Sequence, residues 1–249
     1  MKPVLCVIGG CNGAGKTTLA MELLPLMGIR RFLNADEIAR GLSPLDPSLS
    51  AFRAGRLLLE EARTLLEKEK SFAIESTLSG KTYLNLIELA KTKGYQVVIH
   101  FVVLDSPRQA LRRVAARVLR GGHNVPEEDV RRRFARGRRN FMSVYLPLAD
   151  EWMVWDNASP PAKKVAGNFT HDPEEIMTMI DSSKVEEASV ETMSESELLV
   201  LEASRRATAK MLDFYQRMGI KVTPQMTLAE DDEGSELSTE PGRPEITAP

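Results

Sequence analysis

One stretch near the start of the chain constrains the fold more than any other. Residues 3–9 form a short apolar, β-branched run, the pattern of a fully buried strand. The next residues fit G-x-x-x-x-G-K-[ST], a loop whose glycines let backbone N–H groups wrap around phosphate oxygens. In such a loop Lys16 reaches the β- and γ-phosphates and the Thr17 hydroxyl binds Mg²⁺. The pattern therefore predicts a nucleoside triphosphate site formed by Gly10, Cys11, Asn12, Gly13, Ala14, Gly15, Lys16, Thr17 and Thr18.

The composition is that of a chain that folds around a sizeable core. Apolar residues make up 43% of its 249 residues, and a formal net charge of −2 disfavours a dedicated nucleic-acid binder. Its two cysteines have neither a zinc spacing nor a disulfide framework; Cys11 is either an oxidation-sensitive thiol or a small residue that the loop tolerates. No apolar run of about 18 residues and no charged leader occurs, so we expect a cytoplasmic protein without a membrane span.

Strand patterns alternate with helix patterns along the first two thirds of the chain. This alternation predicts an α/β fold with a parallel five-stranded sheet flanked by helices. The expected strands are residues 3–9, 31–36, 71–75, 95–104 and 151–155, with a further short strand left open near 164–166. The expected helices are residues 16–27, 49–70, 81–93, 107–120 and 126–140. The run at 95–104 is apolar almost throughout, so we expect it at the centre of the sheet.

Composition changes beyond this region and suggests three parts. Residues 1–165 are predicted to form a P-loop domain whose residues 107–140 act as a lid. Residues 166–229 are predicted to be a helical extension, with an amphipathic helix at 194–218. Residues 230–249 carry seven acidic residues and one arginine, and we predict a disordered acidic tail.

Two carboxylates follow predicted strands and are candidates for the chemistry. In parallel sheets ligands bind beyond the carboxyl ends of the strands, which places Asp36 and Glu75 near the phosphates. A phosphotransferase needs a carboxylate that orients the acceptor hydroxyl and takes its proton. The alternatives are structural: Asp36 could be an N-cap for a turn at residues 37–39, and Glu75 a strand-end carboxylate paired with an arginine.

Eleven arginines lie between Arg108 and Arg139, against three acidic residues. Arginine suits forked contacts with phosphate oxygens, and the Gly121-Gly122 break would let two helices fold over a nucleotide as a lid. The alternatives are a solvated basic face, which would account for most of the eleven, or a nucleic-acid patch. No aromatic residues are interleaved for base stacking, so nucleic acid is disfavoured.

Two absent motifs and one further aspartate bear on the class of P-loop protein to which the chain belongs. The sequence has neither the N-K-x-D base reader of GTPases nor the L-S-G-G-Q signature of transporter ATPases. Asp105 follows the strand predicted at 95–104, as a metal-organising aspartate does in many P-loop ATPases. If the protein were primarily an ATPase, Asp105 and not Asp36 would be essential.

Together these residues resemble the zeta-toxin-like family of P-loop kinases over about residues 1–157. The resemblance rests on motifs at residues 9–18, 34–36, 54–56, 72–80, 117 with 121–126, 131–134 and 156–157. It implies a sheet of the adenylate-kinase type, ATP with Mg²⁺, and a small hydroxyl acceptor, which in the toxins is UDP-N-acetylglucosamine. A partner antitoxin is also implied.

The resemblance also implies roles for individual residues. Asp36 matches the catalytic aspartate of the family, and Glu75 matches the glutamate of its third strand. We assign Glu75 to the site that binds the acceptor, together with Thr77 and Arg56. Arg117 matches one of the family's two lid arginines. The other lies in the run 131–133, where Arg132 or Arg133 is the preferred match. With Lys16, these residues predict an ATP-dependent kinase acting on a small molecule. The alternative is an ATP-hydrolysing regulatory protein that uses its C-terminal extension as a partner surface.

Overall fold

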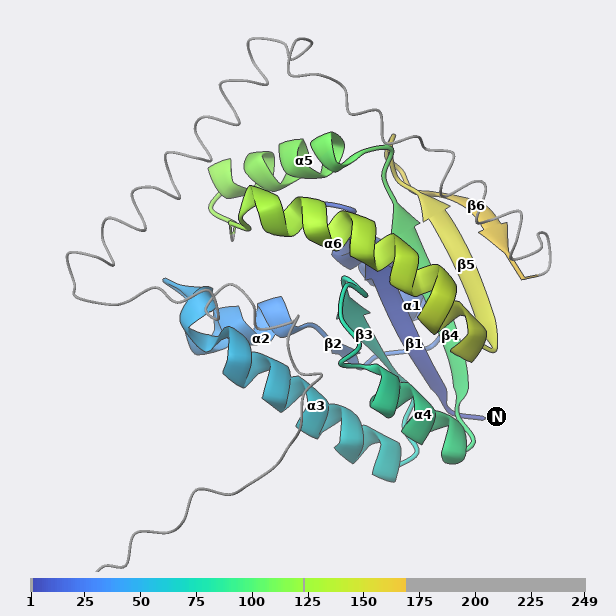
Figure 1. Cartoon of the computed structure of the whole chain (residues 1–249). Coiled ribbons are helices and arrows are strands. Elements are labelled where there is room, and N and C mark those ends of the chain that lie inside the picture. Colours follow the sequence, from blue (N-terminus) through green and yellow to red (C-terminus); the bar gives the residue numbers. More distant parts are fainter. Residues whose placement is uncertain (1, 123, 169–249) are drawn as a thin grey trace, which may run out of the picture.

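The apolar runs of the sequence form the strands of one sheet in the computed structural model, which describes residues 2–122 and 124–168 (Figure 1). The strand order is β2-β3-β1-β4-β5-β6. Pairing is parallel from β2 to β5, and β6 runs antiparallel to β5. The strands are β1 (Val4–Gly10), β2 (Phe32–Leu33), β3 (Phe72–Ser76), β4 (Gln96–Val103), β5 (Glu151–Asp156) and β6 (Lys163–Gly167). The predicted α/β fold and the central position predicted for β4 are confirmed, and β1 lies beside β4 at the centre of the sheet.

The sheet is buried on both faces, which explains the continuous apolar pattern of β1. Leu5 and Val7 point into a core with α3 (Ala51–Glu67) and α4 (Leu84–Thr92). Cys6 and Ile8 point to the opposite face, where α1 (Lys16–Leu26) packs. Each side of the central strand therefore has its own hydrophobic cluster.

The sheet has six strands, where the sequence predicts five and leaves a sixth open. β6 is a short edge strand whose Lys163 and Lys164 side chains are exposed. Charged residues on an edge strand block pairing with other chains, but they also weaken the apolar alternation by which strands are predicted. The sixth strand was thus hard to assign from its sequence pattern.

The strand predicted at residues 31–36 is wrong in its second half. Only β2 pairs as a strand, and the chain then enters α2 (Ala35–Leu42), where the sequence analysis predicts no helix and offers only a helical turn at residues 37–39 as an alternative. The Asn34 side chain accepts hydrogen bonds from the backbone N–H groups of Asp36 (2.9 Å) and Glu37 (3.4 Å). This is an N-cap, so the alternative that Asp36 itself caps a helix is also wrong. Asp36 lies in the first turn of α2.

The remaining helices follow the predicted ranges closely. A 3₁₀ turn, η1 (Pro47–Ser50), precedes α3 in the predicted range 49–70. α5 (Pro107–Leu119) and α6 (Glu127–Asn140) lie on either side of the glycine break. α6 continues into a π-helical turn, η2 (Phe141–Tyr145), and a 3₁₀ turn, η3 (Leu146–Leu148). Figure 1 shows α6 running diagonally across the sheet.

The predicted C-terminal helix at 194–218 and the acidic tail at 230–249 lie outside the described residues, as does nearly all of the predicted extension at 166–229. Within residues 2–122 and 124–168, no helix has the length and apolar character needed to cross a membrane.

Candidate active site

The predicted phosphate loop connects β1 to α1 at the carboxyl edge of the sheet. Gly10, Gly13 and Gly15 have φ values of +142°, +78° and +89°, a backbone region that favours glycine. A Cβ atom on Gly10 would lie 2.5 Å from the Val102 carbonyl oxygen. The spacing of the glycines in the sequence is therefore required by the shape of the loop.

Lys16 is buried and folds back over this loop. Its Nζ donates to the Cys11 carbonyl at 3.1 Å and lies 3.6 Å from Glu75 Oε1. A buried ammonium is costly without a counter-charge, so Glu75 stabilises the lysine inside the site. The role of Lys16 as the phosphate-binding lysine stays a prediction.

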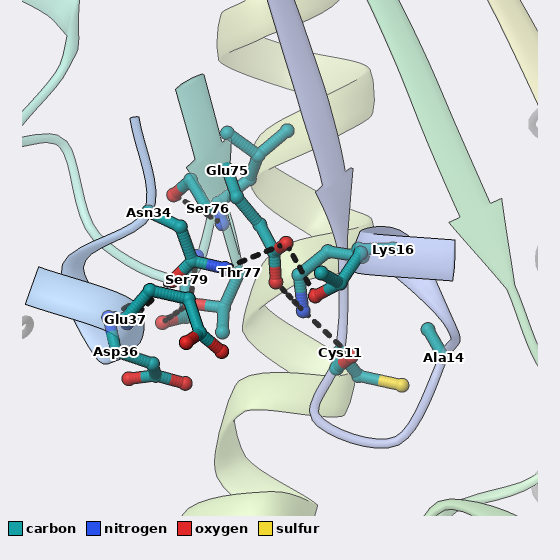
Figure 2. Close-up of polar contacts among 12 residues, drawn as sticks. Cys11, Ala14, Lys16, Asn34, Asp36, Glu37, Glu75, Ser76, Thr77 and Ser79 are labelled. Atoms are coloured by element: carbon teal, nitrogen blue, oxygen red, sulfur yellow. Dashed lines mark hydrogen bonds and ion pairs between the residues drawn. The ribbon is translucent and has the colours of Figure 1, made fainter. Parts of the chain in front are cut away.

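Glu75 connects three elements of the fold (Figure 2). It stands near the end of β3, opposite Ile8 of the neighbouring strand β1. Its Oε2 atom accepts from Thr17 Oγ1 at 2.7 Å and from Asn34 Nδ2 at 3.0 Å. The carboxylate therefore contacts the residue predicted to bind the metal as well as the cap of α2.

The predicted acceptor residues lie in different surroundings. Asp36 is exposed at the start of α2, and Figure 2 shows Glu75 between that helix start and the phosphate loop. Arg56 is exposed on α3. Thr77 is buried after β3, where its Oγ1 lies 2.8 Å from Ser79 Oγ. Asp36 and Thr77 each lie two residues along the chain from one partner of the Asn34–Glu75 hydrogen bond, whereas Arg56 lies on another helix.

A tight turn follows Glu75 and is held by α6. Asn140 Nδ2 donates to the carbonyl oxygens of Leu78 (2.9 Å) and Ser79 (2.8 Å). Gly137 lies so close that a Cβ atom there would be 2.6 Å from the Thr77 carbonyl oxygen. The position of α6 therefore sets the shape of the segment that contains Thr77.

Two of the predicted lid arginines contact residues of the predicted lid segment itself. Arg132 Nη2 pairs with buried Asp129 at 2.8 Å, and Arg117 packs against Gly122 at the end of α5. Arg133 is half-buried on α6. In this structure the residue-by-residue assignment of lid arginines stays a prediction.

Two other arginines, Arg113 and Arg138, act on a residue of the phosphate loop. Arg138 donates to the Leu104 carbonyl at the end of β4, and Arg113 donates to the Asn157 carbonyl at 2.6 Å. Both cations act electrostatically on the Cys11 thiol, as does Lys16. The sequence pattern placed Arg113 on a helix but gave it no role. Helical spacing alone does not show which arginine faces the loop.

The segment predicted as a lid is packed onto the phosphate loop. Ala110 and Val114 of α5 and Phe134 of α6 share a hydrophobic cluster with Cys11 and Ala14. Burial raises the pKa of the Cys11 thiol to about 11, although the Lys16 charge opposes this shift. A thiol with such a pKa is unreactive, which favours the interpretation of Cys11 as a packing residue.

Asp105, the alternative metal residue, is exposed beyond β4, and its backbone N–H donates to Gln109 Oε1 at 3.2 Å. The carboxylate at the Thr17 hydroxyl is that of Glu75. The metal-organising role considered for Asp105 stays a prediction.

The residues present fit a triphosphate with its metal. The first turn of α1 has neither a side-chain cap nor an acidic residue, so its N–H groups remain available to an anion. Within residues 2–122 and 124–168, no group of three or more His, Cys, Asp or Glu side chains could hold a metal ion. A metal here would therefore need phosphate oxygens in addition to Thr17 and Glu75.

Solved structures share this fold. A chain from the PezAT chromosomal toxin-antitoxin system of Streptococcus pneumoniae matches with a TM-score of 0.53 at 16% identity, covering 85% of this chain and 88% of that one. A chain of the AvrRxo1-ORF1:-ORF2 structure with ATP matches with a TM-score of 0.60 at 19% identity, covering 77% of this chain and 66% of that one. Such identities show a common fold.

Sequence relatives define the family. An uncharacterized protein of Haemophilus influenzae is 30% identical over 125 residues, which are 50% of this chain and 88% of the relative. The family model described as an AAA domain matches residues 5–141. Because this match spans more than half of the chain, from β1 through the phosphate loop to the end of α6, the protein belongs to this AAA domain family.

Proposed function

We propose that the protein is an ATP-dependent kinase that transfers a phosphoryl group to a hydroxyl of a small molecule. The observation that carries this proposal is the position of Glu75. It joins the Thr17 hydroxyl and Lys16 of the phosphate loop to Asn34, the cap of the helix that bears Asp36. A single carboxylate thus links the nucleotide side of the site to the side where an acceptor would bind.

The nucleotide would occupy the glycine-rich loop, with Lys16 near its terminal phosphates and Thr17 at Mg²⁺. When bound, ATP and Mg²⁺ supply the transferable phosphoryl group and neutralise its charge. The contact between Glu75 and Thr17 supports a role for Glu75 beside the metal, in addition to the acceptor role implied by the resemblance. Arg113 and Arg138 add positive charge near the loop, next to Cys11.

Asp36 would act as the base for the acceptor hydroxyl. It is exposed, on the start of a helix that is fixed to Glu75 through Asn34. An ionised carboxylate there can accept the hydroxyl proton as phosphoryl transfer proceeds. The resemblance to zeta-toxin-like kinases makes sugar nucleotides such as UDP-N-acetylglucosamine the first acceptor class to test.

The test is a phosphotransfer assay with labelled ATP, Mg²⁺ and a panel of sugar nucleotides, sugars and nucleosides. We expect label to move to one class of acceptor and Asp36→Asn to reduce this transfer about 10²- to 10⁴-fold. Asp105→Asn is the matched control, because Asp105 is also exposed but lies beyond β4. ATP hydrolysis alone with every acceptor, or full transfer by Asp36→Asn, would contradict the proposal.

A protein partner is the second element of the proposal. One of the matched structures comes from a toxin-antitoxin system, and another contains two proteins, ORF1 and ORF2. We propose that this chain inhibits growth when a cognate inhibitor is absent. Overexpression should then arrest growth, and Lys16→Ala should restore it. Equal arrest by wild type and Lys16→Ala would show that growth inhibition does not depend on phosphotransfer.

A further inference from the structure

We propose that Asn157 is a positioning residue that fixes the phosphate loop and connects it to α5. The residue follows β5 directly and is 8% exposed. Its effect on nucleotide binding rests on the function proposed above, whereas its effect on the loop is independent of any ligand. The contacts of its side chain and of its backbone carry the inference separately.

The Asn157 side chain reaches the loop across 143 residues of sequence. Its Nδ2 atom donates to the Ala14 carbonyl at 2.7 Å, in a buried hydrogen bond. The Ala14 carbonyl belongs to the peptide that precedes Gly15, whose φ is +89°. The orientation of that peptide determines where the next N–H groups of the loop point, so the hydrogen bond holds the cradle in shape.

The Asn157 amide lies so close to Gly15 that a side chain at Gly15 would have to displace it. A Cβ atom on Gly15 would lie 2.4 Å from Asn157 Nδ2, and that amide carbon lies 3.7 Å away. Two features therefore favour glycine at position 15: its positive φ and the close approach of this amide. The second requirement cannot be read from the loop motif itself.

The backbone carbonyls of Asn157 and the residue after it are held by α5. Arg113 Nη2 donates to the carbonyl oxygens of Asn157 (2.6 Å) and Ala158 (3.0 Å). Gln109 Nε2 donates to the same Ala158 carbonyl at 2.8 Å. On the sheet side, the Asn157 N–H donates to the Val103 carbonyl at 3.1 Å. Asn157 is thus fixed between α5 and β4 while its side chain holds the loop.

This arrangement makes α5 part of the loop's support. A Cβ atom on Gly13 would lie 2.8 Å from the Ala110 carbonyl oxygen and 3.2 Å from Arg113 Cβ, so α5 also touches the loop directly. A shift of α5 would move the Arg113 guanidinium and, through Asn157, the Ala14 carbonyl. The chain thereby couples the arginine-rich helix to the conformation of the phosphate loop.

The first experiment measures hydrogen exchange of the amides of residues 10–16 in the nucleotide-free full chain. Asn157→Leu keeps the branching at Cγ and the number of non-hydrogen side-chain atoms but removes the donor, so the Ala14 carbonyl loses its partner. We expect these amides to exchange about tenfold faster, the effect of one lost hydrogen bond. Asn140→Leu is the matched control: Asn140 is also 8% exposed and donates to backbone carbonyls, but at residues 78 and 79. It should leave exchange in the loop unchanged even where it lowers the melting temperature.

The second experiment titrates the same variants with ATP and Mg²⁺ by calorimetry. We expect Asn157→Leu to weaken binding about tenfold and Asn140→Leu to bind as wild type does. Arg113→Met should accelerate loop exchange by a smaller factor, because it releases the Asn157 and Ala158 carbonyls but keeps the hydrogen bond from the Asn157 side chain to Ala14. If Arg113→Met leaves loop exchange unchanged, the connection to α5 is wrong.

The two measurements separate failure of this inference from failure of the proposed kinase function. Wild-type exchange rates at residues 10–16 in Asn157→Leu would overturn the positioning role, whatever the protein binds. A wild-type chain that binds no nucleotide would overturn the kinase proposal, while faster loop exchange in Asn157→Leu would still establish the positioning role.

Discussion

The phosphate loop and the start of α2 lie on opposite sides of Glu75 and are built in different ways. The loop is held by buried contacts from distant segments: Lys16 pairs with Glu75, and Asn157 bonds the Ala14 carbonyl. The start of α2 is organised locally by the Asn34 cap and leaves Asp36 exposed. A site that binds one constant group, the triphosphate, can be rigid on that side. The proposed acceptor side combines exposed Asp36 with the turn after Glu75, which buried hydrogen bonds from α6 hold in place.

The largest expected effect is on the rigid side. Lys16→Ala removes the cation that would contact the terminal phosphates and leaves Glu75 without its ion pair. We expect phosphotransfer to fall by about a thousandfold or more. Lys91→Ala is the control, because that lysine also pairs with a carboxylate, Asp150, but is well exposed far from the loop. If Lys16→Ala loses only tenfold or less in phosphotransfer, the reacting phosphates do not bind at Lys16.

The second prediction compares the carboxylate beside the phosphate loop, Glu75, with the carboxylate on the proposed acceptor side, Asp36. Glu75→Gln keeps a side-chain oxygen for Thr17 but loses the negative charge beside the proposed metal position. We expect it to reduce the Mg²⁺-dependent part of ATP affinity about tenfold, as measured by calorimetry with and without EDTA. Asp36→Asn should leave this affinity unchanged and lower only the rate of transfer. Equal losses of affinity in both variants would mean that the two sides are not separable.

The third prediction concerns the sheet beneath the loop. His100 on β4 is 1% exposed, and its Nδ1 accepts from Trp155 Nε1 at 3.0 Å. Burial, aided by the positive charge of Lys164, lowers the pKa of His100 to about 4. The unfolded chain takes up this proton near pH 6.5, whereas the folded chain stays neutral until about pH 4. Stability is therefore full above pH 6.5 and falls by up to about 3 kcal/mol toward pH 4.

Urea unfolding at several pH values measures this loss. His100→Phe removes the titrating group but keeps a ring in the core, so its free energy of unfolding should depend much less on pH between 6.5 and 4.5. Trp155 packs against the cluster that contains Cys11 and Ala14, so the titration acts on the phosphate-loop side of the molecule. If His100→Phe loses stability with pH as steeply as wild type, another group is responsible.

The sequence predicted what depends on contiguous residues. The phosphate loop was assigned correctly as a strand-loop-helix unit because its glycines, Lys16 and Thr17 lie within one segment. The rule that ligands lie beyond strand ends also placed Glu75 near that loop, although Thr17 and Glu75 are 58 residues apart. These predictions succeed because they need only the order and direction of parallel strands.

The missed features depend on tertiary contacts or on a single capping residue. α2 was missed because its start is fixed by one side chain, Asn34, within a segment that also resembles a strand. The contact of Asn157 with Ala14 joins the two ends of the domain and leaves no periodic signal. Which arginine approaches the loop depends on how α5 and α6 are rotated against the sheet, which their sequences do not determine.

The smallest expected effect tests how firmly α6 shapes the acceptor side. Gly137→Ala should gain about 1 kcal/mol in helix propensity but places a methyl group 2.6 Å from the Thr77 carbonyl oxygen. A backbone atom cannot turn aside, so we expect a net loss of about 1–2 kcal/mol and a raised KM for the acceptor at unchanged ATP affinity. Gly55→Ala in α3 is the matched control, because nothing lies within 4 Å of its Cβ position. It should gain about 0.5–1 kcal/mol in thermal or urea unfolding. A stability gain in both variants would show that the turn after Glu75 yields easily, and the acceptor side would then be set by α2 alone.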